Sequence, residues 1–73
     1  MKYLILFFST NHALWSEKLL KKSNIENKIT SVPREFSSDC GYCVEFIGDA
    51  ENVEKILIDN HVEYDRIIEM DNQ

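Results

Sequence analysis

The chain has 73 residues, 44% of them hydrophobic, with a formal net charge of −5 and a sequence pI of about 4.8. A chain this short predicts a single domain over residues 1–73, with one small core. The acidic balance excludes a nucleic-acid binder, which needs a basic stripe, and the apolar run Tyr3–Phe8 is too short for a membrane span or an export signal. We therefore expect a cytoplasmic protein with reduced thiols, no nucleic-acid partner and no membrane contact.

The first half of the chain predicts a strand followed by a helix. Lys2–Phe8 is almost unbroken apolar sequence, which is typical of a central strand covered on both faces. Ser9–Asn11 supplies N-cap candidates for a helix that continues to about Ser23. Leu14 falls outside the apolar arc of this helix. The inner side is predicted to carry Ala13, Ser16, Leu19, Leu20 and Ser23.

The second half predicts two strands, a helix and a last strand. Lys28–Val32 reads as a rather polar edge strand that Pro33 ends, because proline has no N–H to donate to a ladder. Pro33–Gly41 shows neither helical nor strand periodicity, and irregular segments of this length inside small domains tend to be functional. The remaining predicted elements are a strand over Tyr42–Ile47, a helix over about Ala50–Asn60 and a strand over about Val62–Met70.

The element order βαββαβ predicts an α+β fold, namely a ferredoxin-like sandwich with a four-stranded antiparallel sheet and both helices on one face. In this topology three connections meet at one end of the sheet: Ser9–His12, Pro33–Gly41 and Asn60–His61. Both histidines and Cys40 are therefore expected along one edge. The first strand is apolar on both faces, which makes a homodimer through the open face of the sheet plausible.

Cys40 and Cys43 form a CxxC motif, whose spacing allows a disulfide, a shared metal ion or a thiol pair in exchange. A structural disulfide closing so short a ring adds only about 2 kcal/mol, and a cytosolic thiol pool reduces it. In thioredoxin-like proteins such a motif opens a helix, whereas the residues after Cys43 predict a strand. Zinc held by both cysteines with His12 and His61 is disfavoured because the histidines stand alone. We expect no metal and no organic cofactor.

The sequence around Cys40 suits a reactive thiol, which needs access and a stabilised thiolate. Arg34 and the N-terminus of the first helix both favour the thiolate, and Asp39 opposes it. Gly41 permits close backbone approach, and its N–H is available to a sulfur anion. Two alternatives stay open: Arg34 pairs with Glu35 on the surface, and Cys43 is an ordinary buried strand residue.

Two segments of the chain resemble the selenium/sulfur carrier protein-like family of small bacterial domains. The first runs from Phe8 to Leu14 with the Glu-Lys-Leu-Leu that follows at 17–20, and the second, more specific one is Val32–Gly41. The resemblance implies that Cys40 is a carrier thiol within a Pro-Arg…Ser-Ser-x-Cys-Gly loop. The loop residues implied with it are Pro33, Arg34, Ser37, Ser38 and Gly41, and His12 is expected beside the substrate at the same edge.

Three functions are compatible with these features. The first is a carrier rather than a turnover enzyme: Cys40 holds sulfur or selenium as a persulfide-type adduct and passes it between a donor and an acceptor protein. The second is a protein-interaction or regulatory module without chemistry. The third is a small redox domain that cycles a Cys40–Cys43 disulfide.

Overall fold

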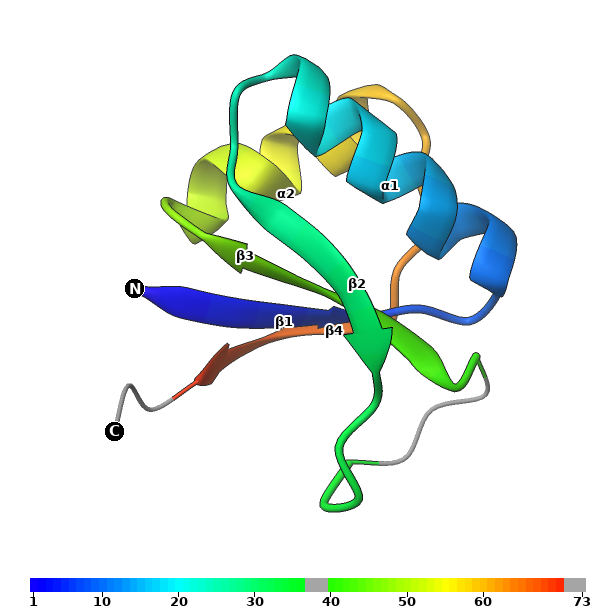
Figure 1. Cartoon of the computed structure of the whole chain (residues 1–73). Helices are drawn as coiled ribbons and strands as arrows, with labels where there is room; N and C mark the ends of the chain where they lie inside the picture. The colour runs from blue at the N-terminus through cyan, green and yellow to red at the C-terminus, as the bar shows by residue number, and fades with distance from the viewer. Residues whose placement is uncertain (37–39, 71–73) are drawn as a thin grey trace.

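The computed structural model describes residues 1–36 and 40–70, which form six elements in the order βαββαβ (Figure 1). The strands form one antiparallel sheet in the order β2-β3-β1-β4, and both helices cover the same face of it. This is the predicted ferredoxin-like sandwich. The elements are β1 (Lys2–Leu6), α1 (Thr10–Lys22), β2 (Asn27–Ser31), β3 (Tyr42–Ile47), α2 (Ala50–Asp59) and β4 (Arg66–Met70).

The main core lies between the sheet and the helices, and its residues follow the periods of their elements. Alternate residues of the strands and one stripe of each helix point inward, because side chains repeat every two residues in a strand and every 3.6 in a helix. Its fully buried members are Ile5, Phe7, Ala13, Leu20, Val44, Phe46, Val53 and Leu57, with Val62 almost as buried.

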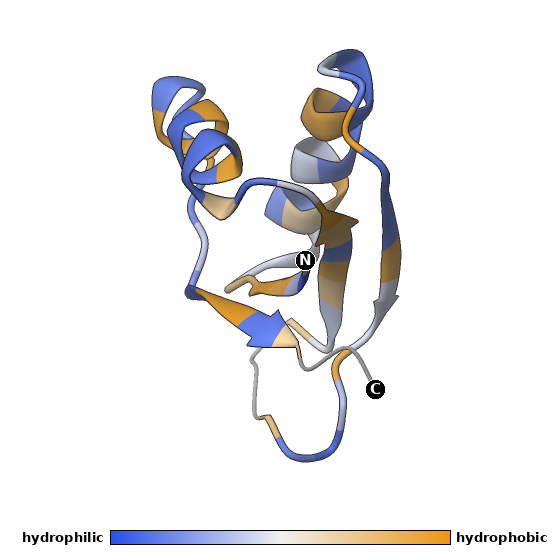
Figure 2. Cartoon of the chain, turned by 90° about the vertical axis from the view of Figure 1, so that its left-hand side faces the viewer, coloured by the Kyte–Doolittle hydropathy of each residue, from blue (hydrophilic) through white to orange (hydrophobic). Residues whose placement is uncertain are grey.

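A second apolar cluster lies on the sheet face opposite the helices. Leu4, Leu6 and Cys43 are 2% exposed or less, and they pack against Val32, Phe36, Ile68 and Met70. Figure 2 shows the segment after β2 extending below the sheet, away from the helices. The second apolar face of β1 is therefore covered within a single chain, which removes the reason for expecting a homodimer through this face.

Both helices end in the Schellman motif, in which a left-handed residue reverses the chain. Asn24 (φ 61°) and His61 (φ 60°) are those residues, and the N–H groups of Ile25 and Val62 donate to the carbonyls of Leu20 and Leu57. In both hydrogen bonds the distance from nitrogen to oxygen is 2.9 Å. Val62 is thus part of the Schellman motif that ends α2.

Several predicted boundaries differ from the observed ones by a few residues, each for its own reason. β4 begins at Arg66 instead of Val62, because Val62 caps α2 and Tyr64 packs on the core between helix and strand. Likewise β1 ends at Leu6 instead of Phe8, where the chain turns toward the N-cap at Ser9. Ser23, predicted on the inner side of α1, is its exposed C-cap.

The described residues include no helix that is both long and apolar enough to cross a bilayer.

Candidate functional site

Cys40 lies directly before β3, at the end of the sheet where α1 begins. Its side chain is half-buried against the helix-side core. The Sγ atom of Cys40 lies 3.5 Å from the hydroxyl oxygen of Thr10, a hydrogen-bond distance for sulfur in which either group can donate. The predicted meeting of the β1–α1 turn with the Cys40 loop is therefore confirmed.

Thr10 is the first residue of α1, and this places the thiol at the positive end of a helix dipole. Ser9 is the N-cap: its backbone is extended (φ −143°, ψ 151°) and its hydroxyl accepts the N–H of His12 at 3.4 Å. Helix N-termini stabilise anions through their free N–H groups and their partial positive charge. A sulfur anion at Cys40 thus meets two favourable features, the helix end and a hydroxyl donor.

His12 connects the start of α1 to the segment between α2 and β4. Its Nδ1 accepts the backbone N–H of Glu63 at 2.9 Å, so the ring nitrogen that remains available as a donor is Nε2. The ring also lies 5.8 Å from that of Trp15, centroid to centroid. His12 was predicted at this edge and is there, fixed by two structural contacts. His61 is exposed in the turn after α2.

Cys43 differs from Cys40 in its burial and in the face of the sheet on which it packs. Its side chain is fully buried on the face opposite the helices, and its Sγ donates to the carbonyl of Ser31 at 3.7 Å. Burial, followed by the nearby charges of Glu45 and Cys40, raises the pKa of Cys43 to about 11 from 9.0. Both cysteines are free thiols. These observations disfavour Cys43 as a second reactive thiol and favour the alternative of a core residue.

The motif loop is partly described. Pro33 opens a turn in which its carbonyl accepts the N–H of Phe36 at 3.1 Å, and Arg34 is exposed within it. No ion pair with Glu35 is found for Arg34 in the parts of the chain that the structure describes. The predicted residues Ser37 and Ser38, together with Asp39, lie outside the described residues.

Gly41 follows Cys40 and has φ 80°, a conformation that side chains disfavour. Apart from its two chain neighbours, no atom of the described residues lies within 4 Å of a Cβ added there. The glycine is therefore explained by its backbone conformation. The open space leaves room for an incoming group beside Cys40.

Two further constellations do not form a site. Within residues 1–36 and 40–70, no three His, Cys, Asp or Glu side chains gather as metal ligands. β3 follows the CxxC as a strand, as predicted, which excludes the thioredoxin context.

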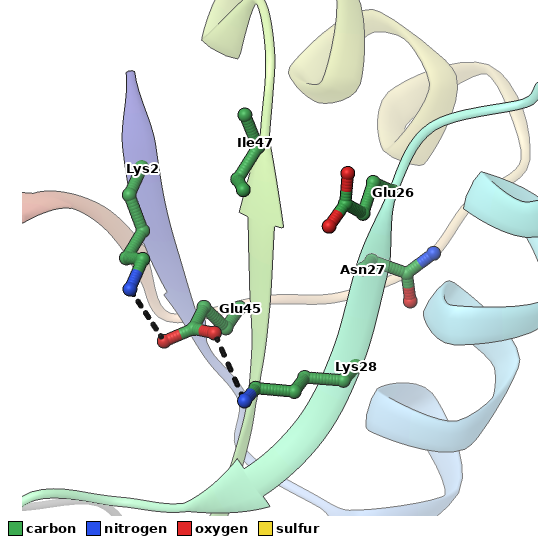
Figure 3. A pocket seen from close by; sticks show the side chains of 6 residues that line it. All are labelled: Lys2, Glu26, Asn27, Lys28, Glu45 and Ile47. Carbon is green, nitrogen blue, oxygen red and sulfur yellow. Dashed lines mark ion pairs between the residues drawn. The ribbon is translucent and has the colours of Figure 1, made fainter.

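A hollow of about 270 Å³ lies at the other end of the sheet (Figure 3). Within it the Glu45 carboxylate pairs with Lys2 at 3.7 Å and with Lys28 at 3.5 Å. Such exposed pairs contribute little stability. Its remaining lining consists of Glu26, Asn27 and Ile47. Because both of its ammonium groups already pair with the Glu45 carboxylate, we assign no chemistry to this hollow.

Sequence reasoning treated Thr10 only as a capping candidate and did not mark Trp15. The signal for Thr10 lay in the topology, which brings the β1–α1 turn to Cys40. The signal for Trp15 lay in the helical wheel, since residues 14 and 15 both fall on the outer side of α1.

The family model described as "Putative Se/S carrier protein-like" matches residues 2–69. No curated protein and no solved structure matches the chain significantly.

Proposed function

The chain belongs to the Se/S carrier protein-like family, and from this premise we propose that it carries sulfur or selenium as a persulfide-type adduct on Cys40. The observation that supports this most directly is the position of the Cys40 Sγ atom, 3.5 Å from the Thr10 hydroxyl at the N-terminus of α1. An accessible sulfur at a helix N-terminus suits both a thiolate nucleophile and a bound persulfide anion.

The loading step is a transfer between sulfur atoms. The Cys40 thiolate attacks the terminal sulfur of a donor protein's persulfide, and a new S–S bond forms. The S–S bond of the donor breaks, its electron pair leaves with the donor's cysteine as a thiolate, and the proton stays on the transferred sulfur. No net oxidation occurs, so no organic cofactor is required. Delivery to an acceptor thiolate repeats these events in the opposite direction, and selenium takes the place of the terminal sulfur without other change.

The residues around Cys40 have distinct roles in this proposal. Thr10 donates a hydrogen bond to the sulfur anion, and Gly41 offers its N–H and leaves space for the adduct. Arg34 adds positive charge from the exposed turn that Pro33 opens, while Ser37 and Ser38 supply further donors. His12 holds the neighbouring segment in place. The setting is the cytoplasm, where thiols stay reduced between transfers.

The redox alternative is weaker. A Cys40–Cys43 disulfide requires both sulfur atoms on one side of β3, whereas Cys40 packs on the helix side and Cys43 on the other. A resolving thiol also needs a thiolate, which the raised pKa of Cys43 opposes.

The test is an intact-mass measurement after loading. The reduced protein is incubated with a persulfide donor, freed of small molecules and weighed with and without reductant. We expect a reducible gain of one sulfur atom in the wild type and in Cys43→Ala, and none in Cys40→Ser. Equal loading of Cys40→Ser would refute the proposal. Protein purified from cells without reductant shows by the same measurement whether the cargo is sulfur or selenium.

The Thr10 hydroxyl is tested separately, because it acts through Cys40. Thr10→Val keeps the shape of the side chain and removes the donor, and Thr10→Ser keeps the donor. We expect the valine variant to load at least about tenfold more slowly than wild type, since a hydrogen bond to a charged group contributes about 1.5–3 kcal/mol and each 1.4 kcal/mol is a factor of about ten. The serine variant is expected to load normally.

A further inference from the structure

Exposed apolar side chains gather in sequence around the start of α1, whose first residue contacts Cys40. Seven large apolar side chains among the described residues are exposed, and three of them fall within the eight residues Phe8–Trp15. These are Phe8, Leu14 and Trp15, exposed by 54%, 45% and 43%. We refer to these three residues as the docking patch. Leu14 lies one helical turn from Thr10 on the same side of α1, and Thr10 contacts Cys40.

Two exposed carboxylates of the α2–β4 connection, those of Glu63 and Asp65, lie beside the start of α1. Residues 49–65 contain six carboxylates and one lysine, a net charge of −5 that equals the net charge of the whole chain, so all other residues balance. The last part of this segment passes behind the beginning of α1 on its way to β4 (Figure 1). Two hydrogen bonds fix its position. The backbone N–H of Glu63 donates to the His12 ring, and the backbone N–H of Asp65 donates to the carbonyl of Leu6 at 2.7 Å.

The side chains of Glu63 and Asp65 are exposed, because Tyr64 between them packs on the core. The docking patch therefore has an acidic border on the side of the α2–β4 segment. A centre with an exposed tryptophan and a charged rim is the usual composition of a protein-binding surface.

We propose that the docking patch receives the sulfur or selenium donor or acceptor, and that this partner presents an apolar surface with a basic rim. The inference rests on the proposed function, because a group transfer requires the partner's reacting atom to reach Cys40, and the patch flanks in sequence Thr10, which contacts Cys40. The charge favours a basic partner over a second copy of this chain, since two acidic borders would repel each other.

The experiment uses three synthetic peptides of equal length, each with one cysteine activated as a mixed disulfide with thionitrobenzoate. The flanking residues are leucine and lysine, leucine and glutamate, or serine and lysine. The Cys40 thiolate attacks the peptide sulfur, a protein–peptide disulfide forms, and thionitrobenzoate leaves with the electron pair as a coloured thiolate. Peptide mapping verifies that the adduct is on Cys40.

We expect the leucine–lysine peptide to react about fivefold or more faster than either of the others, with the lysine advantage decreasing as salt is added. Trp15→Ala should remove the advantage of leucine, whereas Ile47→Ala should not. Ile47 is a matched control, because it is 46% exposed and lies at the opposite end of the sheet, paired with Lys2.

The charge is tested by two double variants that each remove two carboxylates. Glu63→Gln with Asp65→Asn should abolish the advantage of lysine over glutamate. Glu26→Gln with Glu51→Gln changes the net charge equally but lies at the other end of the molecule, and it should keep most of that advantage. Equal loss in both pairs would show that only the net charge matters and would overturn the inference.

A small neutral disulfide, dithiodipyridine, distinguishes failure of this inference from failure of the proposed function. If Cys40 does not react with it, the reactive thiol itself is refuted. If Cys40 reacts with it but shows equal rates with all three peptides, the docking inference alone is wrong. Association of the wild-type chain with itself, lost in Trp15→Ala, would assign the docking patch to a second copy instead.

Discussion

At the scale of single residues, the two cysteines lie close together in sequence but in different environments. Cys40 precedes β3 and packs half-buried on the helix side, next to the Thr10 hydroxyl. Cys43 lies within β3 and points to the other face, where it is fully buried. Because burial disfavours a charged sulfur, the thiolate of Cys43 is strongly suppressed. We therefore propose chemistry at Cys40 alone, whereas Cys43 contributes to packing.

This difference predicts selective alkylation. With iodoacetamide near neutral pH, Cys40 should be modified while Cys43 stays unmodified as long as the protein is folded. A pKa of about 11 instead of 9.0 lowers the thiolate population of Cys43 by about a hundredfold, and burial slows its reaction further. Mass spectrometry of digested samples measures both sites, and unfolded protein serves as the control in which both react. Equal labelling in the folded state contradicts the assignment.

The same pKa predicts a loss of stability in alkali. The folded-state pKa of Cys43 lies above its ordinary value of 9.0, so its stabilising effect is complete below pH 9 and disappears as the pH rises to about 11. The free energy of unfolding should fall by up to about 2–3 kcal/mol over this interval. Urea unfolding of the wild type and of Cys43→Val isolates the contribution, because all other titrating groups are shared. Parallel curves for the two proteins would contradict it.

At the scale of elements, the ends of α1 and α2 decide what surrounds the site. The Ser9 cap places the start of α1 at Cys40, and the left-handed His61 turns the chain so that Val62 packs back on the core. The backbone of the following α2–β4 segment is then hydrogen-bonded to the His12 ring of α1. The position of the acidic border of the docking patch therefore depends in part on one hydrogen bond between α1 and a segment that is distant in sequence.

Loss of this bond should loosen the α2–β4 segment locally. In His12→Ala the Glu63 amide loses its acceptor, which costs about 1 kcal/mol and corresponds to about fivefold faster hydrogen exchange. The Asp65 amide is an internal control, since it donates to the Leu6 carbonyl and does not involve His12. Exchange rates measured by NMR should rise at Glu63 much more than at Asp65. An equal rise at both amides would indicate general destabilisation instead.

At the scale of the whole molecule, the sheet buries apolar side chains on both faces although helices cover only one. Phe36, from the turn that leads toward Cys40, packs with Leu4, Leu6 and Cys43 on the second face. The two ends of the loop that leads to Cys40 are thus held on opposite sides of the sheet, by Phe36 below and by the Cys40–Thr10 contact above. A domain of this size has little core to spare, so this second cluster matters for its stability.

Replacement of Phe36 tests the second cluster. Phe36→Ala should lower the free energy of unfolding by about 1–2 kcal/mol, less than for a fully buried phenylalanine because Phe36 is half-buried. Phe8→Ala removes the same atoms from an exposed position and should cost less than about 0.5 kcal/mol. Urea denaturation measures both, and equal values would show that Phe36 contributes no packing.

The sequence by itself determined the α+β class, the order of elements and the end of the sheet where Cys40 lies. Periodicity is a local property, and the βαββαβ order leaves few ways to cover one sheet with two helices. Patterning also identified the inner residues Ala13 and Leu20 of α1. It could not locate the start of β4, because Val62 has an apolar side chain in a strand and in a Schellman motif alike.

Only the tertiary structure decided which face each cysteine occupies, that Thr10 is the contact of Cys40, and that Phe36 covers the second face of β1. It also showed that His12 binds Glu63, 51 positions away in sequence. These facts depend on contacts between segments that are distant along the chain, and no local pattern encodes such contacts. The CxxC spacing suggested a pair of thiols, whereas the fold separates them, because burial and sheet face are set by the packing of all six elements together.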